Sequence, residues 1–311
     1  MKTNISLILI LCLLLGACKN GNASSQSKSE TPQDTIKAIK MPAIPQMMTA
    51  PEQRADFLAK HYWDNVNFAD TNYIHHPEVT EQAWADYCDL LNPVPLETAQ
   101  QAMRNVIDRT NVDKKVFTYI TDLADKYLYD PNSPMRNEEF YIPVLEAMIA
   151  SPVLNETEKI RPQARLKLAQ KNRIGTKALN FTYTLASGAQ GSLYQLKAEY
   201  LLLFINNPGC QACTETIEGL KNAPIINQLL QEKKLVLLSI YPDEELDEWK
   251  KHLSEFPNEW INGYDKKFTI KEEQVYDLKA IPTLYLLDKD KTVLLKDATA
   301  PAIEAYLMQH Q

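Results

Sequence analysis

The chain has 311 residues, of which 45% are hydrophobic and 23% are charged, and its formal net charge is −7. These proportions are ordinary for a folded globular protein, and the length leaves room for two domains. The acidic balance argues against nucleic acid as a partner and against a polybasic patch that binds membranes.

The first 18 residues predict a protein that is exported. The positively charged Met1-Lys2 is followed by the apolar run Ile5–Leu15, which is too short to span a bilayer but typical of a signal peptide. The four residues that end in Cys18 (Leu-Gly-Ala-Cys) resemble the bacterial lipobox. By that resemblance Cys18 is diacylated and becomes the first residue of the mature chain. The alternative is an ordinary secreted protein that is cleaved nearby, and either outcome places the chain in an oxidising compartment.

Residues 19–50 predict a flexible tether. Asn, Gly, Ser, Lys, Gln, Thr and Pro dominate this stretch and aromatic residues are missing from it, so it has little with which to form a core. Attachment to a membrane then depends on the lipid at Cys18, because no transmembrane segment follows the signal peptide. Cys88, Cys210 and Cys213 follow the tether, and three cysteines are too few for a disulfide framework.

Residues 51–172 predict an all-α domain, because apolar residues recur there at helical spacing. Thr80 is the predicted N-cap of its second helix, and a further helix is predicted to run unbroken over 112–129. Cys88 lies on an apolar stripe and is expected in the core, since free cysteine is among the most buried residue types. His75-His76-Pro77-Glu78 could contact a metal, but nothing nearby completes a ligand set, so we expect a solvated loop and no metal site. The pattern does not show what this domain does.

From residue 173 the pattern changes to β, and we take 173–311 as a second domain. Alternating residues over 181–185 and 192–196 predict a hairpin. A strand over 199–205, with the apolar run Leu201–Ile205, and the run 235–240 are predicted to be buried parallel strands. A helix over 244–256, a strand over 284–287, an edge strand over 292–295 and a closing helix over 301–309 follow. This order of elements predicts an α/β domain with a central mixed sheet flanked by helices.

The strand 199–205 leads into the most informative stretch of the chain. Asn206-Asn207-Pro208-Gly209 are turn formers, and Cys210-Gln211-Ala212-Cys213 then opens a helix. A cysteine at the N-terminus of a helix lies near unpaired N–H groups and the positive end of the helix dipole, which favours thiolate over thiol. Cys213 lies one turn further on, where it can resolve a mixed disulfide. The pattern predicts a redox dithiol.

Three other interpretations of the two cysteines stay open. Half of a zinc site is one, although a closed site needs four ligands and no second CxxC exists in the sequence. A structural disulfide is another. The third is a fold that keeps the cysteines but serves as a binding module. Peroxidase chemistry on Cys210 is disfavoured, because the threonine and arginine context expected of a peroxiredoxin is missing.

The succession of elements resembles the thioredoxin fold, and more narrowly the TlpA-like thiol–disulfide reductases that are tethered to membranes. The hairpin 181–196, the Cys210–Cys213 motif and Ile281-Pro282-Thr283 before a strand carry the resemblance. It implies that Pro282 is cis and lies beside the dithiol, and that Ile281, Pro282 and Thr283 present backbone groups to an incoming peptide. The layout also resembles Bacteroidetes lipoproteins whose helical part is a domain of unknown function.

Three positions depart from the family pattern. Gly209 stands where many thioredoxins have Trp, and Phe204 stands where a buried acid assists proton transfer. Thr216 occupies the position of a glutamate that is common in TlpA-like reductases. These departures leave no obvious general base for Cys213.

We therefore expect a thiol–disulfide oxidoreductase, on the reductase side, anchored by lipid in the cell envelope of a Gram-negative bacterium and facing the periplasm. Cys210 is the expected nucleophile and Cys213 the resolving thiol, with no cofactor besides their disulfide. Its expected partners are protein thiols and disulfides and an upstream electron donor of the envelope. The alternative is a non-enzymatic binding lipoprotein, in which the helical domain recognises a partner and the rest is scaffold.

Overall fold

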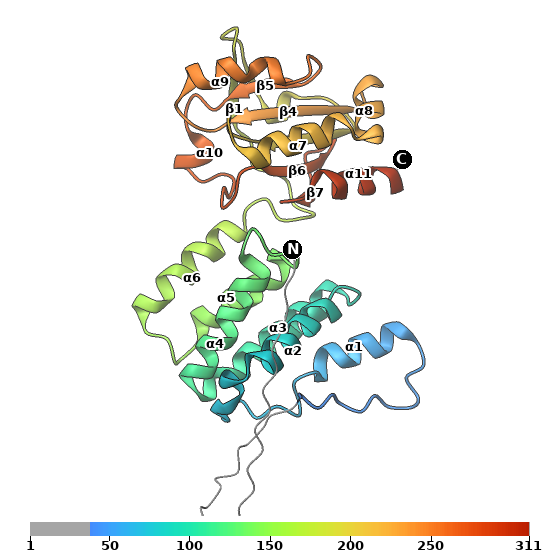
Figure 1. Ribbon diagram of the computed structural model, residues 1–311, viewed down its shortest axis with the longest axis vertical. Coiled ribbons are helices and arrows are strands. Elements are labelled where there is room, and N and C mark those ends of the chain that lie inside the picture. Colours follow the sequence, from blue (N-terminus) through green and yellow to red (C-terminus); the bar gives the residue numbers. More distant parts are fainter. Residues whose placement is uncertain (1–37, 311) are drawn as a thin grey trace, which may run out of the picture. The chain divides into compact units, whose positions relative to one another are not determined.

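The computed structural model describes residues 38–310 (Figure 1). The predicted signal peptide, Cys18 and the larger part of the predicted tether lie outside the described residues. Within 38–310, no helix combines the length and the apolar character that crossing a membrane requires.

The predicted all-α domain is confirmed. Its helices are α1 (Pro51–His61), α2 (Pro77–Leu90), α3 (Leu96–Arg109), α4 (Lys114–Ala124), α5 (Glu138–Ala150) and α6 (Glu156–Ala169). Side chains close several of their starts: Asp113 caps α4, Asn137 caps α5, and Asn155 forms a reciprocal capping box with Glu158 on α6. These caps satisfy N–H groups that the first turn of a helix leaves without partners.

Aromatic residues form the centre of this domain's core. Trp84 and Tyr87 are fully buried, and Tyr62 and Trp63 pack against them with ring centroids 5.2 to 6.2 Å apart. Cys88 lies in the same core, as predicted. Burial raises the pKa of its thiol far above the usual range, which leaves it neutral and inert.

Three local features of the helical domain differ from the sequence-based expectation. The predicted tether extended to residue 50, but Ile39 packs against the helical core and Asn65 donates a hydrogen bond to the Lys40 carbonyl at 2.9 Å. Thr80 is not an N-cap: it lies buried inside α2 and its hydroxyl donates to the carbonyl of Tyr73. The predicted helix over 112–129 changes to a π-helical turn at Asp125–Tyr129.

The C-terminal domain is built on a seven-stranded mixed sheet with the order β2-β1-β5-β4-β3-β6-β7. The strands are β1 (Thr182–Leu185), β2 (Gln190–Ser192), β3 (Tyr200–Ile205), β4 (Leu235–Tyr241), β5 (Ile261–Tyr264), β6 (Thr283–Asp288) and β7 (Val293–Lys296). β3 and β4 pair in parallel, with Ile205 opposite Ile240, and β6 pairs antiparallel to β3, with Thr283 opposite Ile205. The end of β3 therefore meets the start of β6.

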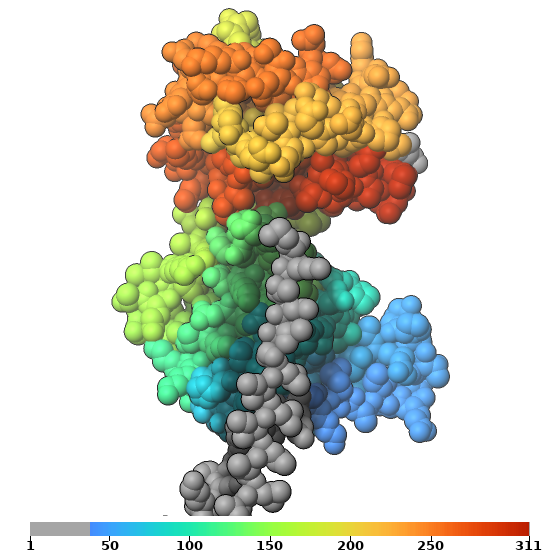
Figure 2. Space-filling model, in the orientation of Figure 1, coloured from blue at the N-terminus to red at the C-terminus, as the bar shows by residue number. Residues whose placement is uncertain are grey.

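Both faces of the sheet are covered, which explains why the central strands are apolar throughout. Leu202 and Phe204 of β3 face a cluster with α7 (Gln211–Lys221), α8 (Pro224–Gln231) and α11 (Ala300–Gln309). Leu201 and Leu203 face the opposite cluster, which includes Ile270 of α10 (Thr269–Glu272). Figure 2 shows α7 in yellow and α11 in dark red side by side on the surface.

Some elements of this domain differ from their prediction. The second arm of the hairpin is β2 followed by a 3₁₀ turn at Leu193–Gln195, so its strand is shorter than predicted. Helix α8 was not predicted at all. The helix predicted over 244–256 is α9 (Leu246–His252) followed by a 3₁₀ turn. Helix α9 and strand β5 lie between the dithiol and Pro282 in the chain, and β5 pairs in parallel with β4.

Candidate active site

The turn between β3 and α7 places Cys210 at the start of the helix. Gly209 has a φ of +70°, in the left-handed region that favours glycine, so it reverses the chain between the strand and the helix. Cys210 is the N-cap of α7, and its sulfur accepts a hydrogen bond from the backbone N–H of Cys213 at 3.3 Å. The sulfur thus satisfies one of the free N–H groups of the first helical turn.

The two thiols differ in their surroundings. Cys210 is half-buried, whereas Cys213 is 2% exposed, and both are free thiols. Burial raises the pKa of Cys213 to about 12, and its hydrogen bond with Cys210 adds to this, while a hydrogen bond from the backbone of Asn207 acts in the opposite direction. Cys213 therefore stays protonated near neutral pH, and Cys210 is the thiol that a substrate can reach.

The loop that contains Pro282 lies against the dithiol. The Ile281–Pro282 peptide bond is cis, as the family resemblance implies. The thiol of Cys210 faces the carbonyl oxygen of Ile281 at 3.8 Å, although the two residues are 71 positions apart. Thr283 begins β6 and its hydroxyl donates to the carbonyl of Ala280 at 2.6 Å, which closes the turn. The structure brings together the residues that the sequence singled out beyond the leader.

A polar cluster beside the dithiol was missed by the sequence reasoning. The side-chain N–H of Asn207 donates to Asp243 at 3.0 Å, and the Lys271 ammonium pairs with the same carboxylate at 2.6 Å. Partial burial acts to raise the pKa of Asp243, but the hydrogen bonds from Lys271 and Asn207 outweigh it and lower the pKa overall. Asn207 and Asp243 follow the neighbouring parallel strands β3 and β4, whose carboxyl ends share one edge of the sheet. The register that brings them together is set by tertiary packing, so the sequence carried no signal for this cluster.

Of the three departures from the family pattern, Gly209 supplies the positive φ of the turn, and the surroundings of the other two are as follows. Phe204 is fully buried and its ring meets Trp260 edge-on at 6.4 Å between centroids. Glu215 is exposed and accepts a hydrogen bond from Gln211, and the hydroxyl of Thr216 bonds within its own helix. Among residues 38–310, no carboxylate is hydrogen-bonded to Cys213.

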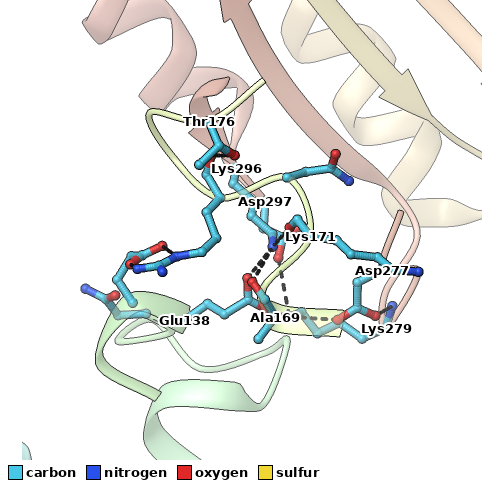
Figure 3. A network of polar contacts seen from close by, with 12 residues as sticks. Glu138, Ala169, Lys171, Thr176, Asp277, Lys279, Lys296 and Asp297 are labelled. Atoms are coloured by element: carbon cyan, nitrogen blue, oxygen red, sulfur yellow. Dashed lines mark hydrogen bonds and ion pairs between the residues drawn. The ribbon is translucent and has the colours of Figure 1, made fainter. Parts of the chain in front are cut away.

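The segment that precedes the cis-proline loop is anchored to the helical domain through a network of polar contacts (Figure 3). Lys279 has an 8% exposed side chain and pairs with Glu138 of α5 at 2.9 Å, with Asp277 at 3.2 Å and with Asp297 at 3.5 Å. Burial acts to lower the pKa of Lys279, but the three carboxylates raise it well above its usual value. Lys296 pairs with the same Glu138.

The linker after α6 adds backbone anchors to the same segment. The ammonium of Lys171 donates to the carbonyls of Glu273 and Gln274, at 3.2 and 2.5 Å. The side chain of Asn172 donates to the carbonyl of Val275 at 2.7 Å. The chain on the N-terminal side of the cis-proline loop is therefore held by residues outside the C-terminal domain's own sheet.

Comparison with known proteins agrees with this architecture. Residues 17–172 match the sequence profile described as a domain of unknown function, DUF5106, and residues 198–293 match the profile described as thioredoxin-like. No protein of curated function matches the chain.

Several solved structures resemble it. The crystal structure of a thioredoxin-like protein from Bacteroides caccae is 83% identical, with a TM-score of 0.87 over 89% of this chain and 100% of that one. The C-terminal domain of a protein from Bacteroides fragilis is 69% identical over 44% of this chain and 98% of that one, with a TM-score of 0.44. The thioredoxin domain of a thiol-disulfide oxidoreductase from Bacteroides vulgatus is 19% identical over 44% and 97%, with a TM-score of 0.40. The chain therefore belongs to the thioredoxin-like proteins and carries an N-terminal DUF5106 domain.

Proposed function

We propose that the chain is a thiol–disulfide oxidoreductase that reduces protein disulfides in the cell envelope. The thioredoxin-like fold supports redox chemistry in general. The observation that carries the proposal is the arrangement of three groups. The half-buried Cys210 sulfur accepts the N–H of Cys213, it faces the Ile281 carbonyl at 3.8 Å, and Cys213 lies buried one helical turn away.

The reaction consists of two thiol–disulfide exchanges. The thiolate of Cys210 attacks one sulfur of a substrate disulfide, forms a mixed disulfide and releases the other substrate sulfur as a thiolate. The Cys213 thiol then gives up its proton and attacks the Cys210 sulfur, which releases the second substrate thiol. Two electrons have passed to the substrate and the Cys210–Cys213 disulfide has formed. An upstream electron donor of the envelope, itself a dithiol, returns two electrons and two protons and restores both thiols.

The backbone of Ile281, beside the dithiol, can form hydrogen bonds with the backbone of a substrate. Pro282 has no N–H, and the Ile281 backbone next to Cys210 offers groups to which an extended peptide can add as a short strand. Ile281, Pro282 and Thr283 are thus the proposed substrate-binding segment. Binding through backbone groups accommodates many sequences, which suits a reductase that acts on proteins.

The proposed location follows from the leader. Lipid on Cys18 would anchor the chain in the envelope of a Gram-negative bacterium, with the two domains facing the periplasm. The dithiol of Cys210 and Cys213 would then work in an oxidising compartment, where disulfides of other proteins are the available substrates.

Two measurements test the proposed function. The purified protein, reduced with dithiothreitol, is expected to reduce the interchain disulfides of insulin, and Cys210→Ser is expected to abolish this activity. Equilibration in redox buffers is expected to show one two-electron transition assigned to Cys210 and Cys213. If the wild type shows no turnover and its transition matches that of an unstructured dithiol peptide, the alternative of a binding lipoprotein with a thioredoxin-like scaffold replaces this proposal.

A further inference from the structure

A cavity of about 410 Å³ lies beside the cis-proline loop and is shared by both domains. Its wall includes Tyr129 and Leu168 of the helical domain and Asp243, Lys271, Leu278 and Ile281 of the C-terminal domain. The volume falls within the range of pockets that bind small ligands or side chains. The neighbourhood of the dithiol is therefore not formed by the thioredoxin-like part alone.

Two residues that line the cavity connect it to the dithiol segment. The carbonyl of Ile281, a lining residue, is 3.8 Å from the Cys210 sulfur. Asp243, another lining residue, accepts a hydrogen bond from Asn207, which lies three positions before Cys210. A peptide that presents its cysteine to Cys210 and pairs with the Ile281 backbone has a neighbouring side chain within reach of this space.

Tyr129, which the helical domain contributes to the cavity wall, is held in place by several contacts. Tyr129 ends the π-helical turn Asp125–Tyr129, and such turns are rare and occur frequently at functional sites. The guanidinium of Arg165 lies 4.0 Å from the centre of the Tyr129 ring, and the Lys279 ammonium lies 5.0 Å from it. Contacts with cations from both domains thus hold this ring at the cavity.

The residues that line the cavity also indicate what kind of ligand group it can bind. Its charged groups already have partners: Lys271 pairs with Asp243, and Lys279 with Glu138, Asp277 and Asp297. What is left to contact a ligand is the apolar surface of Leu168, Leu278 and Ile281, the ring of Tyr129 and, at the exposed side, the amide of Gln274. A charged ligand would compete with these ion pairs, whereas burial of an apolar side chain in the cavity lowers the free energy by removing apolar surface from water.

We propose that this cavity is a specificity subsite for an apolar side chain next to the reactive cysteine of a polypeptide substrate, and that the DUF5106 domain contributes Tyr129 and Leu168 to its wall. The inference rests on the proposed oxidoreductase function. It gives the helical domain a role in substrate choice. Tyr129 and Leu168 would act on binding of the substrate and leave the dithiol chemistry unchanged.

The test uses four probes and the full mature chain. Three probes are disulfide-linked peptide dimers that differ in having Leu, Ala or Phe on both sides of the cysteine, and the fourth is bis(2-hydroxyethyl) disulfide, which has no side chain. The wild type is expected to reduce the Leu peptide with a kcat/KM about tenfold higher than the Ala peptide. Leu168→Trp, which fills the cavity, is expected to remove this preference and to leave the rate with the small disulfide unchanged.

Two further variants complete the design. Lys167→Trp adds the same side chain at the exposed neighbouring position and is expected to keep the preference. Leu168→Ala enlarges the cavity and is expected to shift the preference toward a Phe peptide, so the test stands even if Leu168→Trp does not fold. The subsite proposal alone is overturned if the wild type does not prefer the Leu peptide to the Ala peptide. It is also overturned if folded Leu168→Trp, or Leu168→Ala, keeps the same peptide preference as the wild type. Failure of the wild type to reduce the small disulfide overturns the proposed function and the subsite with it.

Discussion

Glu138 is the residue whose removal should most weaken the junction between the two domains. Its side chain is 11% exposed and pairs with both Lys279 and Lys296, which are 8% and 6% exposed. Removing one member of a buried ion pair typically costs about 3–5 kcal/mol, because the remaining charge stays buried without compensation. Lys279 retains Asp277 and Asp297 as partners, so we expect Glu138→Ala to cost about 3 kcal/mol, at the lower end of that range.

Urea denaturation followed by tryptophan fluorescence measures this loss as a change in the free energy of unfolding. Glu156→Ala is the matched control, because its 88% exposed carboxylate pairs with Lys159 at 3.4 Å and such surface pairs contribute less than about 1 kcal/mol. If Glu138→Ala loses no more stability than Glu156→Ala, the network does not hold the domains together as argued.

Three further predictions concern single residues. Iodoacetamide should modify Cys210 first. Burial raises the pKa of Cys213 to about 12, so its thiol keeps its proton at lower pH and should react appreciably only as the pH approaches that value. Equal alkylation rates of Cys210 and Cys213 at pH 8 would contradict the assignment. Gly209→Ala should cost about 1–2 kcal/mol in unfolding free energy, because φ is +70° while the space around the added methyl is open, and a neutral variant would refute the backbone argument. Cys18→Ala should release a folded protein from the membrane fraction, and a variant that still sediments with membranes disproves the lipid anchor.

Local patterns in the sequence were sufficient for much of the fold. The apolar run before Asn206 has no polar position, because β3 is covered on both faces, and this marked it as a central strand. The turn formers and the cysteine spacing then placed the dithiol at a helix start, where the structure has it. Thr80 shows the limit of local signals: a threonine before an apolar stripe suits an N-cap, but here its hydroxyl bonds to Tyr73 seven positions earlier.

Contacts between distant segments were beyond such patterns. Asn207, Asp243 and Lys271 look like ordinary loop residues until the register of β3 with β4 brings them together. Glu138 and Lys279 are 141 positions apart, and their pairing depends on how two domains meet. Side chains whose partners are set by tertiary packing leave no periodic trace in the sequence, which is why the helical domain's share of the site was not foreseen.

The central claim is that Cys210 attacks a substrate disulfide and Cys213 resolves the product, and trapping tests it most directly. Full-length Cys213→Ser and Cys210→Ser, each reduced and then mixed with oxidised insulin, are separated on a non-reducing gel, and adducts are mapped by mass spectrometry. The structure predicts a stable mixed disulfide through Cys210 in Cys213→Ser and none in Cys210→Ser, because the remaining Cys213 thiol is buried and protonated. Adducts of equal yield in both variants, or in neither, would contradict the claim.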